Sequence, residues 1–309
     1  MVQCTICKKR EAIYLRVYSG VSLCRICFED SIINKVKTTI SKYNMFEYND
    51  KIAIALSGGK DSTTLLYILN EIERKFPKST IVAVTVDEGI SNYRDEALRI
   101  ASENCDFLGI KHEIISFKDL YGYTLDKIVL KASKYSLTPC AICGVLRRRA
   151  LNIIARKAGA SKIATAHNLD DEVQTMLINI LHGDPFRIVR VRPVLDSIHM
   201  GFIKRVKPLC EVPEREIALF AYIKGIRFQD LPCPYAVNAL RNDVRNMLNR
   251  LEEKHPGIKF SIYRSLERIR SNLEKVFPQV ELKRCALCGE PCVGEICQTC
   301  EILRNLKLI

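Results

Sequence analysis

The chain has 309 residues, of which 48% are apolar, so we expect a folded protein with a substantial core and one or more smaller modules. It has no apolar run of about 18 residues, which excludes a membrane span. The opening sequence MVQCTICKKR has no apolar signal segment, so we expect a cytoplasmic protein. Fourteen cysteines in a reducing compartment favour metal sites or thiol chemistry over disulfides. The formal net charge of +13 favours an anionic partner, most simply nucleic acid.

Residues 51–186 alternate between strand and helix patterns. Lys51–Leu56 and Thr80–Val86 are short apolar runs rich in β-branched residues and predict buried strands, with weaker strands at His112–Phe117 and Lys162–Ala166. The predicted helices between them are Ser62–Phe76, Asn92–Leu108, Leu120–Tyr135, Cys143–Ala158 and Asp170–Leu181. This alternation predicts an α/β fold with a doubly wound, mainly parallel sheet, whose ligands bind at the carboxyl ends of the strands.

The pattern after Arg187 is mainly helical, with predicted helices at Glu214–Lys224, Arg241–Glu253 and Lys259–Phe277. We therefore expect four parts along the chain. They are a cysteine module in 1–30, the α/β domain in 31–210, a helical region in 211–280 and a second cysteine module in 281–309.

Each end of the chain carries two Cys-x2-Cys pairs. The eight residues are Cys4, Cys7, Cys24, Cys27, Cys285, Cys288, Cys297 and Cys300. Four thiols on two short turns can enclose a tetrahedral ion, so we predict one Zn²⁺ at each end. Such a module can fold a terminus that lacks its own core, or it can contact RNA, and both readings stay open.

The stretch IALSGGKDSTTLL, residues 54–66, places two glycines between a predicted strand and a predicted helix. The glycines let backbone N–H groups converge and the helix start adds positive potential, which predicts a phosphate site. The spacing is not that of Walker A. SGGKDS resembles the PP-loop of the ATP pyrophosphatases, which cleave ATP between its α and β phosphates and adenylate a substrate.

This resemblance implies a HUP-type PP-loop domain that binds ATP at two strand ends and the loop between strand and helix. The implied residues are Ala55, Leu56, Ser57, Gly58, Gly59, Lys60, Asp61, Ser62, Val86 and Asp87. Ser57, Gly58, Gly59 and Ser62 would hold the pyrophosphate, and Asp61 would act catalytically through Mg²⁺.

TAHNLDDEVQT, residues 165–175, is a second junction between a predicted strand and a predicted helix. It is similar to the G-H-N-x-D-D-x-x-x-T pattern of PP-loop tRNA-modifying enzymes, with Ala166 in place of glycine. We expect Thr165 and His167 at the ATP site and Asp171 in metal binding or catalysis. Asp170 is expected as a helix cap, although Asn168 could also supply the cap.

Six cysteines lie outside the terminal modules, and three of these six are in motifs of their own. Cys140 and Cys143 lie in TPCAICG, where Pro139 marks a helix start that should lower the thiol pKa, and Cys233 lies in LPCPYA. Three ligands are too few for a closed zinc site, whereas a [4Fe–4S] cluster can leave one iron open to hold a sulfide. The alternative is a persulfide on Cys140 or Cys143 that Cys233 resolves through a disulfide.

In their order along the chain, these motifs resemble the tRNA 2-thiouridine synthetases (the TtuA group and the archaeal and eukaryotic wobble-uridine thiolases). The resemblance covers nearly the whole chain. It implies a [4Fe–4S] cluster on Cys140, Cys143 and Cys233 beside the ATP site, which Gly144 and Arg147 would also contact. Arg147 would be the catalytic cation for the α-phosphate. The C2 oxygen of a tRNA uridine would be adenylated, and sulfur on the open iron would then displace AMP.

The implied partners are tRNA and a sulfur donor, which could be sulfide, a persulfide carrier or a thiocarboxylated ubiquitin-like protein; a homodimer fits the same likeness. Residues 146–157 and 186–193 are basic stretches near the site. Late arginines could grip the tRNA body: Arg241, Arg245, Arg250, Arg264, Arg268 and Arg270. Two alternatives are another PP-loop enzyme, such as a 2-thiocytidine synthetase or a lysidine-type ligase, and a non-enzymatic zinc-bearing RNA-binding protein.

Overall fold

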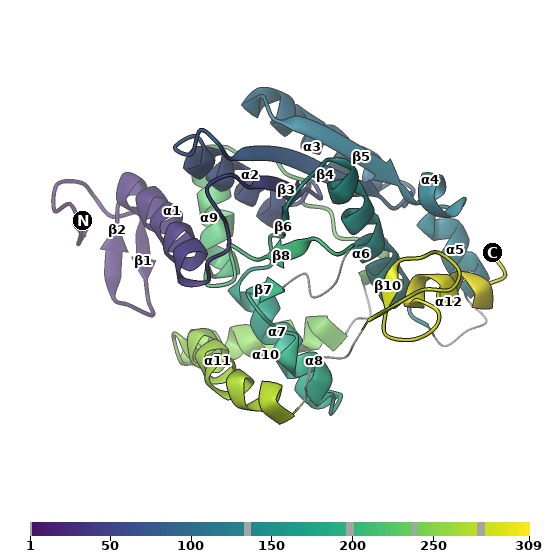
Figure 1. The fold of residues 1–309 in the computed structure, drawn as a ribbon. Helices are drawn as coiled ribbons and strands as arrows, with labels where there is room; N and C mark the ends of the chain where they lie inside the picture. The colour runs from purple at the N-terminus through teal and green to yellow at the C-terminus, as the bar shows by residue number, and fades with distance from the viewer. Residues whose placement is uncertain (1, 133–136, 196–200, 237–239, 277–281) are drawn as a thin grey trace.

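A computed structural model of the chain describes residues 2–132, 137–195, 201–236, 240–276 and 282–309 (Figure 1). At its centre is a six-stranded sheet with the order β5-β4-β3-β6-β8-β7. The strands are β3 (Lys51–Ala55), β4 (Thr80–Asp87), β5 (Lys111–Ser116), β6 (Lys162–Ala164), β7 (Val194–Leu195) and β8 (Lys204–Val206). Five strands are parallel, and β7 pairs antiparallel with β8 at the edge. The predicted mainly parallel sheet is confirmed.

Helices cover both faces of this sheet, which is why the central strands β3 and β4 are apolar and buried along most of their length. They are α2 (Lys60–Glu73), α3 (Arg94–Leu108), α4 (Phe117–Tyr121), α5 (Leu125–Ala132), α6 (Pro139–Lys157) and α7 (Leu169–Leu181). Along β3 the side chains alternate between the two hydrophobic cores: Ile52 and Ile54 pack with α2 and α7, whereas Ala53 packs with α5 and α6. The strand period of two therefore divides the core into two layers.

The structure differs in three details from the predicted elements. The helix expected at Leu120–Tyr135 is two helices, α4 and α5, because Gly122 ends α4 with a left-handed φ of 76°; Tyr135 lies outside the described residues. Helix α6 begins at Pro139, as the TPCAICG motif predicts, and so starts four residues before the periodic stretch from Cys143; Thr138 caps it. Helix α8 (Pro185–Val189) and the short strands β7 and β8 lie in the region expected to be mainly helical.

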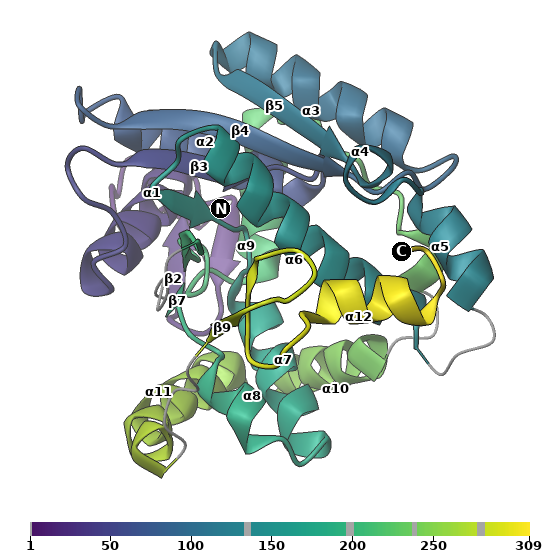
Figure 2. The same ribbon diagram turned by 45° about the vertical axis from the view of Figure 1, so that its right-hand side comes forward.

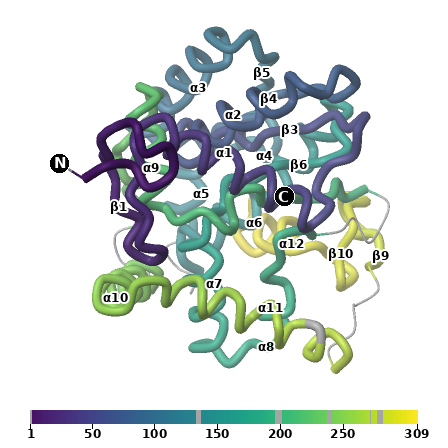
Figure 3. The backbone as a smooth tube through the Cα atoms, turned by 90° about the vertical axis from the view of Figure 1, so that its left-hand side faces the viewer, coloured from purple at the N-terminus to yellow at the C-terminus, as the bar shows by residue number. Residues whose placement is uncertain are grey.

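The helical region packs against the α/β domain, with α9 (Glu214–Lys224) beside α1 (Arg25–Lys42) and α2. It also contains the single 3₁₀ turn η1 (Pro234–Ala236), α10 (Leu240–Lys254) and α11 (Ile258–Val276). The predicted helix end at Phe277 lies outside the described residues. Helices α10 and α11 pack against α7, and Figure 3 shows them along one edge of the molecule. Helix α7 thus joins this region to the sheet.

The two cysteine modules lie at opposite ends of the molecule (Figure 1). The first contains β1 (Tyr14–Arg16), β2 (Val21–Leu23) and the start of α1 (Arg25–Lys42), and α1 continues past residue 30 into the core. The second contains β9 (Lys283–Arg284), β10 (Pro291–Cys292) and α12 (Gln298–Asn305). Figure 2 shows α12 beside α6, against which it packs. Among the described helices, none is both long and apolar enough for a bilayer span.

Candidate nucleotide and thiol site

Both predicted nucleotide motifs lie at the carboxyl edge of the sheet, where the strand order changes direction. The SGGKDS loop follows β3 and leads into α2, and residues 165–171 follow the neighbouring strand β6 and lead into α7. The Asn168 side chain lies near the Asp61 carboxylate across this junction, and it offsets a small part of the rise that burial causes in the Asp61 pKa. Ligands of open α/β sheets bind at such a switch point.

The SGGKDS loop is held by its own hydroxyl groups. Ser57 donates its N–H to the Ser62 Oγ over 3.1 Å, and the two hydroxyl oxygens lie 2.9 Å apart. Gly58 has a φ of 85°, and a Cβ there would lie 2.4 Å from the Ala97 carbonyl oxygen, so only glycine fits. No described side chain caps α2, which leaves its first N–H groups for an anion.

A buried ion pair holds the ends of β3 and β4 together behind this loop. Arg94 donates from Nη1 to the Ser57 carbonyl over 2.9 Å and from Nη2 to the Val86 carbonyl over 2.7 Å. Its Nε lies 2.9 Å from one carboxylate oxygen of Glu88, whose other oxygen lies 3.6 Å from Nη1 of Arg147. Arg94 and Glu88 are both buried, whereas the Arg147 side chain is half-exposed. Glu88 therefore links the nucleotide loop to the predicted α-phosphate cation.

Three carboxylates gather in front of the loop. The Lys60 ammonium group lies 2.8 Å from Asp61 and 3.1 Å from Glu214, so it points toward these two carboxylates. Burial raises the pKa of Asp171 to about 6, with a further contribution from Asp61. Burial also raises the pKa of Asp61. The positive charge of Lys60 lowers this pKa, and the negative charge of Glu214 raises it further. Carboxylate oxygens are the ligands that Mg²⁺ prefers, but these three do not all lie within 4.8 Å of one another, so Mg²⁺ here stays a prediction.

The two aspartates of α7 have different roles. Asn168, rather than Asp170, caps this helix: its side chain accepts the Asp171 N–H, and the Asp171 carboxylate accepts the Asn168 N–H. Asp170 is buried, pairs with Lys259 of α11, and accepts the N–H of Glu214 at the start of α9 over 2.8 Å. Asp170 thus joins three helices, and Asp171 remains near Asp61.

His167 lies in a strongly positive part of the site. Its Nδ1 is 3.0 Å from the Thr165 Oγ1. The His167 side chain is exposed, so the desolvation is partial; this desolvation and the nearby cations Lys207, Arg147 and Arg241 lower the pKa of the imidazole. The same cations would attract the phosphates of a nucleotide or of RNA.

The structure brings Cys140, Cys143 and Cys233 together at the start of α6. The Cys140 thiol lies 3.4 Å from the carbonyl oxygen of Tyr235, in the turn that directly follows Cys233. Cys143 and Cys233 pack against the same hydrophobic core. The expected low thiol pKa is wrong for Cys143, because burial raises it to about 11, with Arg147 opposing this rise and the other two thiols adding to it.

The spacing of these thiols tests which metal centre they fit. Among the described residues, only the two terminal cysteine groups have all their ligand atoms within 4.8 Å of one another. At least one sulfur pair of the trio is therefore more widely spaced than that. A soft three-sulfur donor set with wider spacing fits a multinuclear iron–sulfur centre better than a single ion.

Comparison with known proteins places this geometry in a family. The model of a PP-loop domain matches residues 29–252. The chain is 34% identical to tRNA 2-thiolation protein NcsA of Haloferax volcanii over the whole of both chains. It is also 34% identical to tRNA-5-methyluridine(54) 2-sulfurtransferase of Pyrococcus horikoshii, covering 97% of this chain and 93% of the relative. The U34-tRNA thiolase NcsA from Methanococcus maripaludis, solved with its [4Fe–4S] cluster, superposes with a TM-score of 0.86 at 35% identity, covering 99% of this chain and 97% of that one.

The chain is a PP-loop protein of the tRNA 2-thiolation family. The resemblance drawn from the sequence motifs is thereby confirmed.

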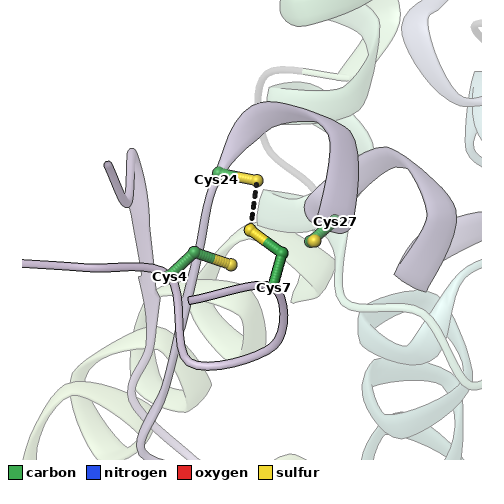
Figure 4. A group of neighbouring side chains, drawn as sticks. All are labelled: Cys4, Cys7, Cys24 and Cys27. Atoms are coloured by element: carbon green, nitrogen blue, oxygen red, sulfur yellow. Dashed lines mark hydrogen bonds between the residues drawn. The ribbon is translucent and has the colours of Figure 1, made fainter. Parts of the chain in front are cut away.

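This member of the tRNA 2-thiolation family carries two compact cysteine groups. Figure 4 shows Cys4, Cys7, Cys24 and Cys27 converging, with the Cys7 and Cys24 sulfur atoms 3.9 Å apart. In the C-terminal module, the sulfur atoms of Cys288 and Cys297 lie 3.6 Å apart, in one group with Cys285 and Cys300. Each group of four thiols fits a tetrahedral Zn²⁺, while the zinc itself remains a prediction. Cys292 lies outside this group, with its sulfur 3.0 Å from the Gly294 carbonyl oxygen.

Several site residues of this thiolation-family protein were missed from the sequence. Glu88, Arg94 and Glu214 lie in no motif, and their roles depend on tertiary pairing. The sequence offered one signal for the first two: they are oppositely charged and follow the end of a predicted strand, six residues apart. Arg241 was expected to grip the tRNA body. Its guanidinium instead donates to the Thr175 hydroxyl over 2.9 Å and lies 3.8 Å from Asp171, so it belongs to the site.

Proposed function

We propose that this chain is an ATP-dependent tRNA 2-thiouridine synthetase, which replaces the C2 oxygen of a tRNA uridine with sulfur. The observation that carries the proposal is the meeting of the nucleotide loop and three cysteines at one edge of the sheet, joined through Glu88 and Arg147. Membership of the tRNA 2-thiolation family supports it.

The nucleotide loop would bind ATP for adenylation. The Ser57 and Ser62 hydroxyls and the first N–H groups of α2 would hold the pyrophosphate part, and Arg147 would neutralise charge at the α-phosphate. Asp61 and Asp171 would hold Mg²⁺, which when bound balances the phosphate charge. The uridine C2 oxygen attacks the α-phosphorus and pyrophosphate leaves, so that a poor leaving oxygen becomes part of AMP.

The three thiols would serve the sulfur step. Cys140, Cys143 and Cys233 would hold a [4Fe–4S] cluster, which when bound supplies an iron with an open position for the sulfur that displaces AMP. Cys143 packs against a buried apolar core, whereas Cys140 is exposed, so the open side of the trio faces Cys140.

The wider assignments are part of the same proposal. The substrate is a tRNA, and the sulfur comes from sulfide, a persulfide carrier or a thiocarboxylated ubiquitin-like protein. Two zinc ions hold the terminal modules, and the enzyme works in the cytoplasm, where its cysteines stay reduced. A homodimer is the proposed assembly.

The test is an anaerobic reaction of the iron-loaded protein with unmodified tRNA, ATP, Mg²⁺ and sulfide, followed by mass analysis of the nucleosides. We expect 2-thiouridine and an equal amount of AMP, and neither with Asp61→Ala. A 2-thiocytidine product would replace the proposal by a different PP-loop enzyme. If tRNA binds but no thionucleoside forms, the non-enzymatic reading is supported.

The cluster assignment has its own test. We expect Cys233→Ala to lose most iron and acid-labile sulfide after anaerobic purification. Cys105→Ala is the matched control, because Cys105 is a buried core thiol away from the trio. Unchanged iron in Cys233→Ala, with thiolation lost, would favour the persulfide route.

A further inference from the structure

A cavity of about 670 Å³ lies between α6, α8, the β7–β8 region and the C-terminal cysteine module. It is distinct from the nucleotide loop and is lined by parts of both basic stretches. The arginines in its lining are Arg148, Arg149, Arg190, Arg192 and Arg205. We call it the α6–α8 cavity.

The charge of the α6–α8 cavity favours an anionic ligand. Glu290 and Glu301 are the acidic residues of its described lining, and Glu290 is already paired with Arg156 over 2.6 Å. Arg205 donates to the backbone carbonyl of Arg148 over 2.7 Å, which brings two cationic side chains into the same region. Burial, together with the Arg148 charge, lowers the pKa of Arg205 to about 10. An anion bound here would relieve this repulsion.

Aromatic rings make one kind of anion fit best. Phe186 and Phe202 both line the cavity, and they remain 52% and 37% exposed although both side chains are large and apolar. Exposed rings beside arginine planes are the groups on which unpaired RNA bases stack. An acidic protein segment would use the arginines but has no need of two rings. The lining therefore favours RNA over an acidic protein.

The cavity is also close to the reaction site. On α6 the Arg148 guanidinium lies against Gly144, the direct neighbour of Cys143, because a Cβ at Gly144 would be 3.2 Å from the Arg148 Nη1. We propose that the α6–α8 cavity binds an unpaired nucleotide of the tRNA that neighbours the modified uridine, with its phosphate on Arg148 and Arg205 and its base on Phe202 and Phe186. This inference rests on the proposed function and adds a specific site for the substrate.

The test measures tRNA binding by the iron-loaded protein at several salt concentrations. Arg148→Ala should weaken binding about tenfold and reduce the slope of log affinity against log salt by about 1, because one phosphate contact is lost. Phe202→Ala should weaken binding by a similar factor without changing the salt slope, since stacking releases no counterions. Phe202→Tyr should restore binding, whereas Phe202→Leu, which fills the space without a ring, should not.

Arg99→Ala is the matched control, since this exposed arginine lies on α3, away from the cavity, and should bind tRNA as the wild type does. Thermal melting and ATP binding verify that each variant is folded. Wild-type tRNA affinity in both Phe202→Ala and Phe202→Leu would overturn the inference. A second result would also overturn it: a cavity variant that keeps wild-type tRNA affinity and thiolates with sulfide, but not with a protein sulfur donor. The cavity would then bind the donor rather than the tRNA. Failure of the proposed function is seen separately, as absence of 2-thiouridine with the wild type.

Discussion

Replacing Glu88 with glutamine tests the ion pair behind the nucleotide loop. Glu88 is 4% exposed and its two carboxylate oxygens face two different arginines, at 2.9 and 3.6 Å. Removing one partner of a buried pair costs about 3–5 kcal/mol. The Arg94 Nε and the nearer Glu88 oxygen are 2.9 Å apart without hydrogen-bond geometry, so glutamine removes the charge attraction to Arg94. The Arg147 side chain is half-exposed, so its pairing with Glu88 adds under about 1 kcal/mol. We therefore expect a loss of about 3 kcal/mol in urea unfolding.

Glu88→Gln should also weaken ATP binding, on the order of tenfold, because Arg94 holds the Ser57 and Val86 carbonyls at the two strand ends. The measurement is ATP titration under conditions where the variant is fully folded. Asp50→Asn is the control, because Asp50 is equally buried and pairs with Lys162 at the opposite edge of the sheet. It should lose stability but keep ATP affinity. If Glu88→Gln also loses stability but keeps wild-type ATP affinity, the Arg94–Glu88 pair has only a structural role and our reasoning is wrong.

Three further changes test other parts of the structure. Gly58→Ala should abolish ATP binding and destabilise the fold by at least about 1–2 kcal/mol, because of its positive φ and the clash with Ala97; wild-type ATP affinity would contradict the loop geometry. Burial lowers the pKa of His112 below 6.5, so its contribution to stability is full above pH 6.5 and is lost as the pH falls. His112→Gln should therefore reduce the acid loss in unfolding free energy by up to about 1.4 kcal/mol per pH unit below 6.5, and parallel curves for variant and wild type would refute this. Cys297→Ser should lose one zinc equivalent and Cys292→Ser none, measured by metal analysis; equal zinc in both would remove Cys297 from the ligand group.

The sequence predicted the elements with strong local patterns and missed those without them. The buried strands β3 and β4 and the helix α9 are continuous in their pattern and were predicted within two residues. Strand β8 has only three residues, two of them charged, so it is held in place by pairing with β6 rather than by its own sequence. The break at Gly122 depends on a left-handed backbone conformation that periodicity does not reveal.

The same distinction applies to the site. Motif residues such as Ser57 and Asp171 were predicted from the loops that carry them, because strand ends in a parallel sheet must meet at one edge. The Arg94–Glu88 pair and the role of Arg241 arise from tertiary contacts between separate elements, and a single sequence carries no pattern for such contacts. Burial of Cys143 likewise outweighs the helix-start effect that local reasoning predicts.

Helix α6 carries Cys140, Cys143 and Arg147 near its start, and α12 of the C-terminal module packs along it through Ile302 and Leu303. The C-terminal module thus supports α6, the helix whose residues are proposed to serve both adenylation and sulfur transfer. If the C-terminal module holds the Zn²⁺ that we predict, removing this ion would weaken the support of α6 and impair both half-reactions at once, at a distance from either reacting atom.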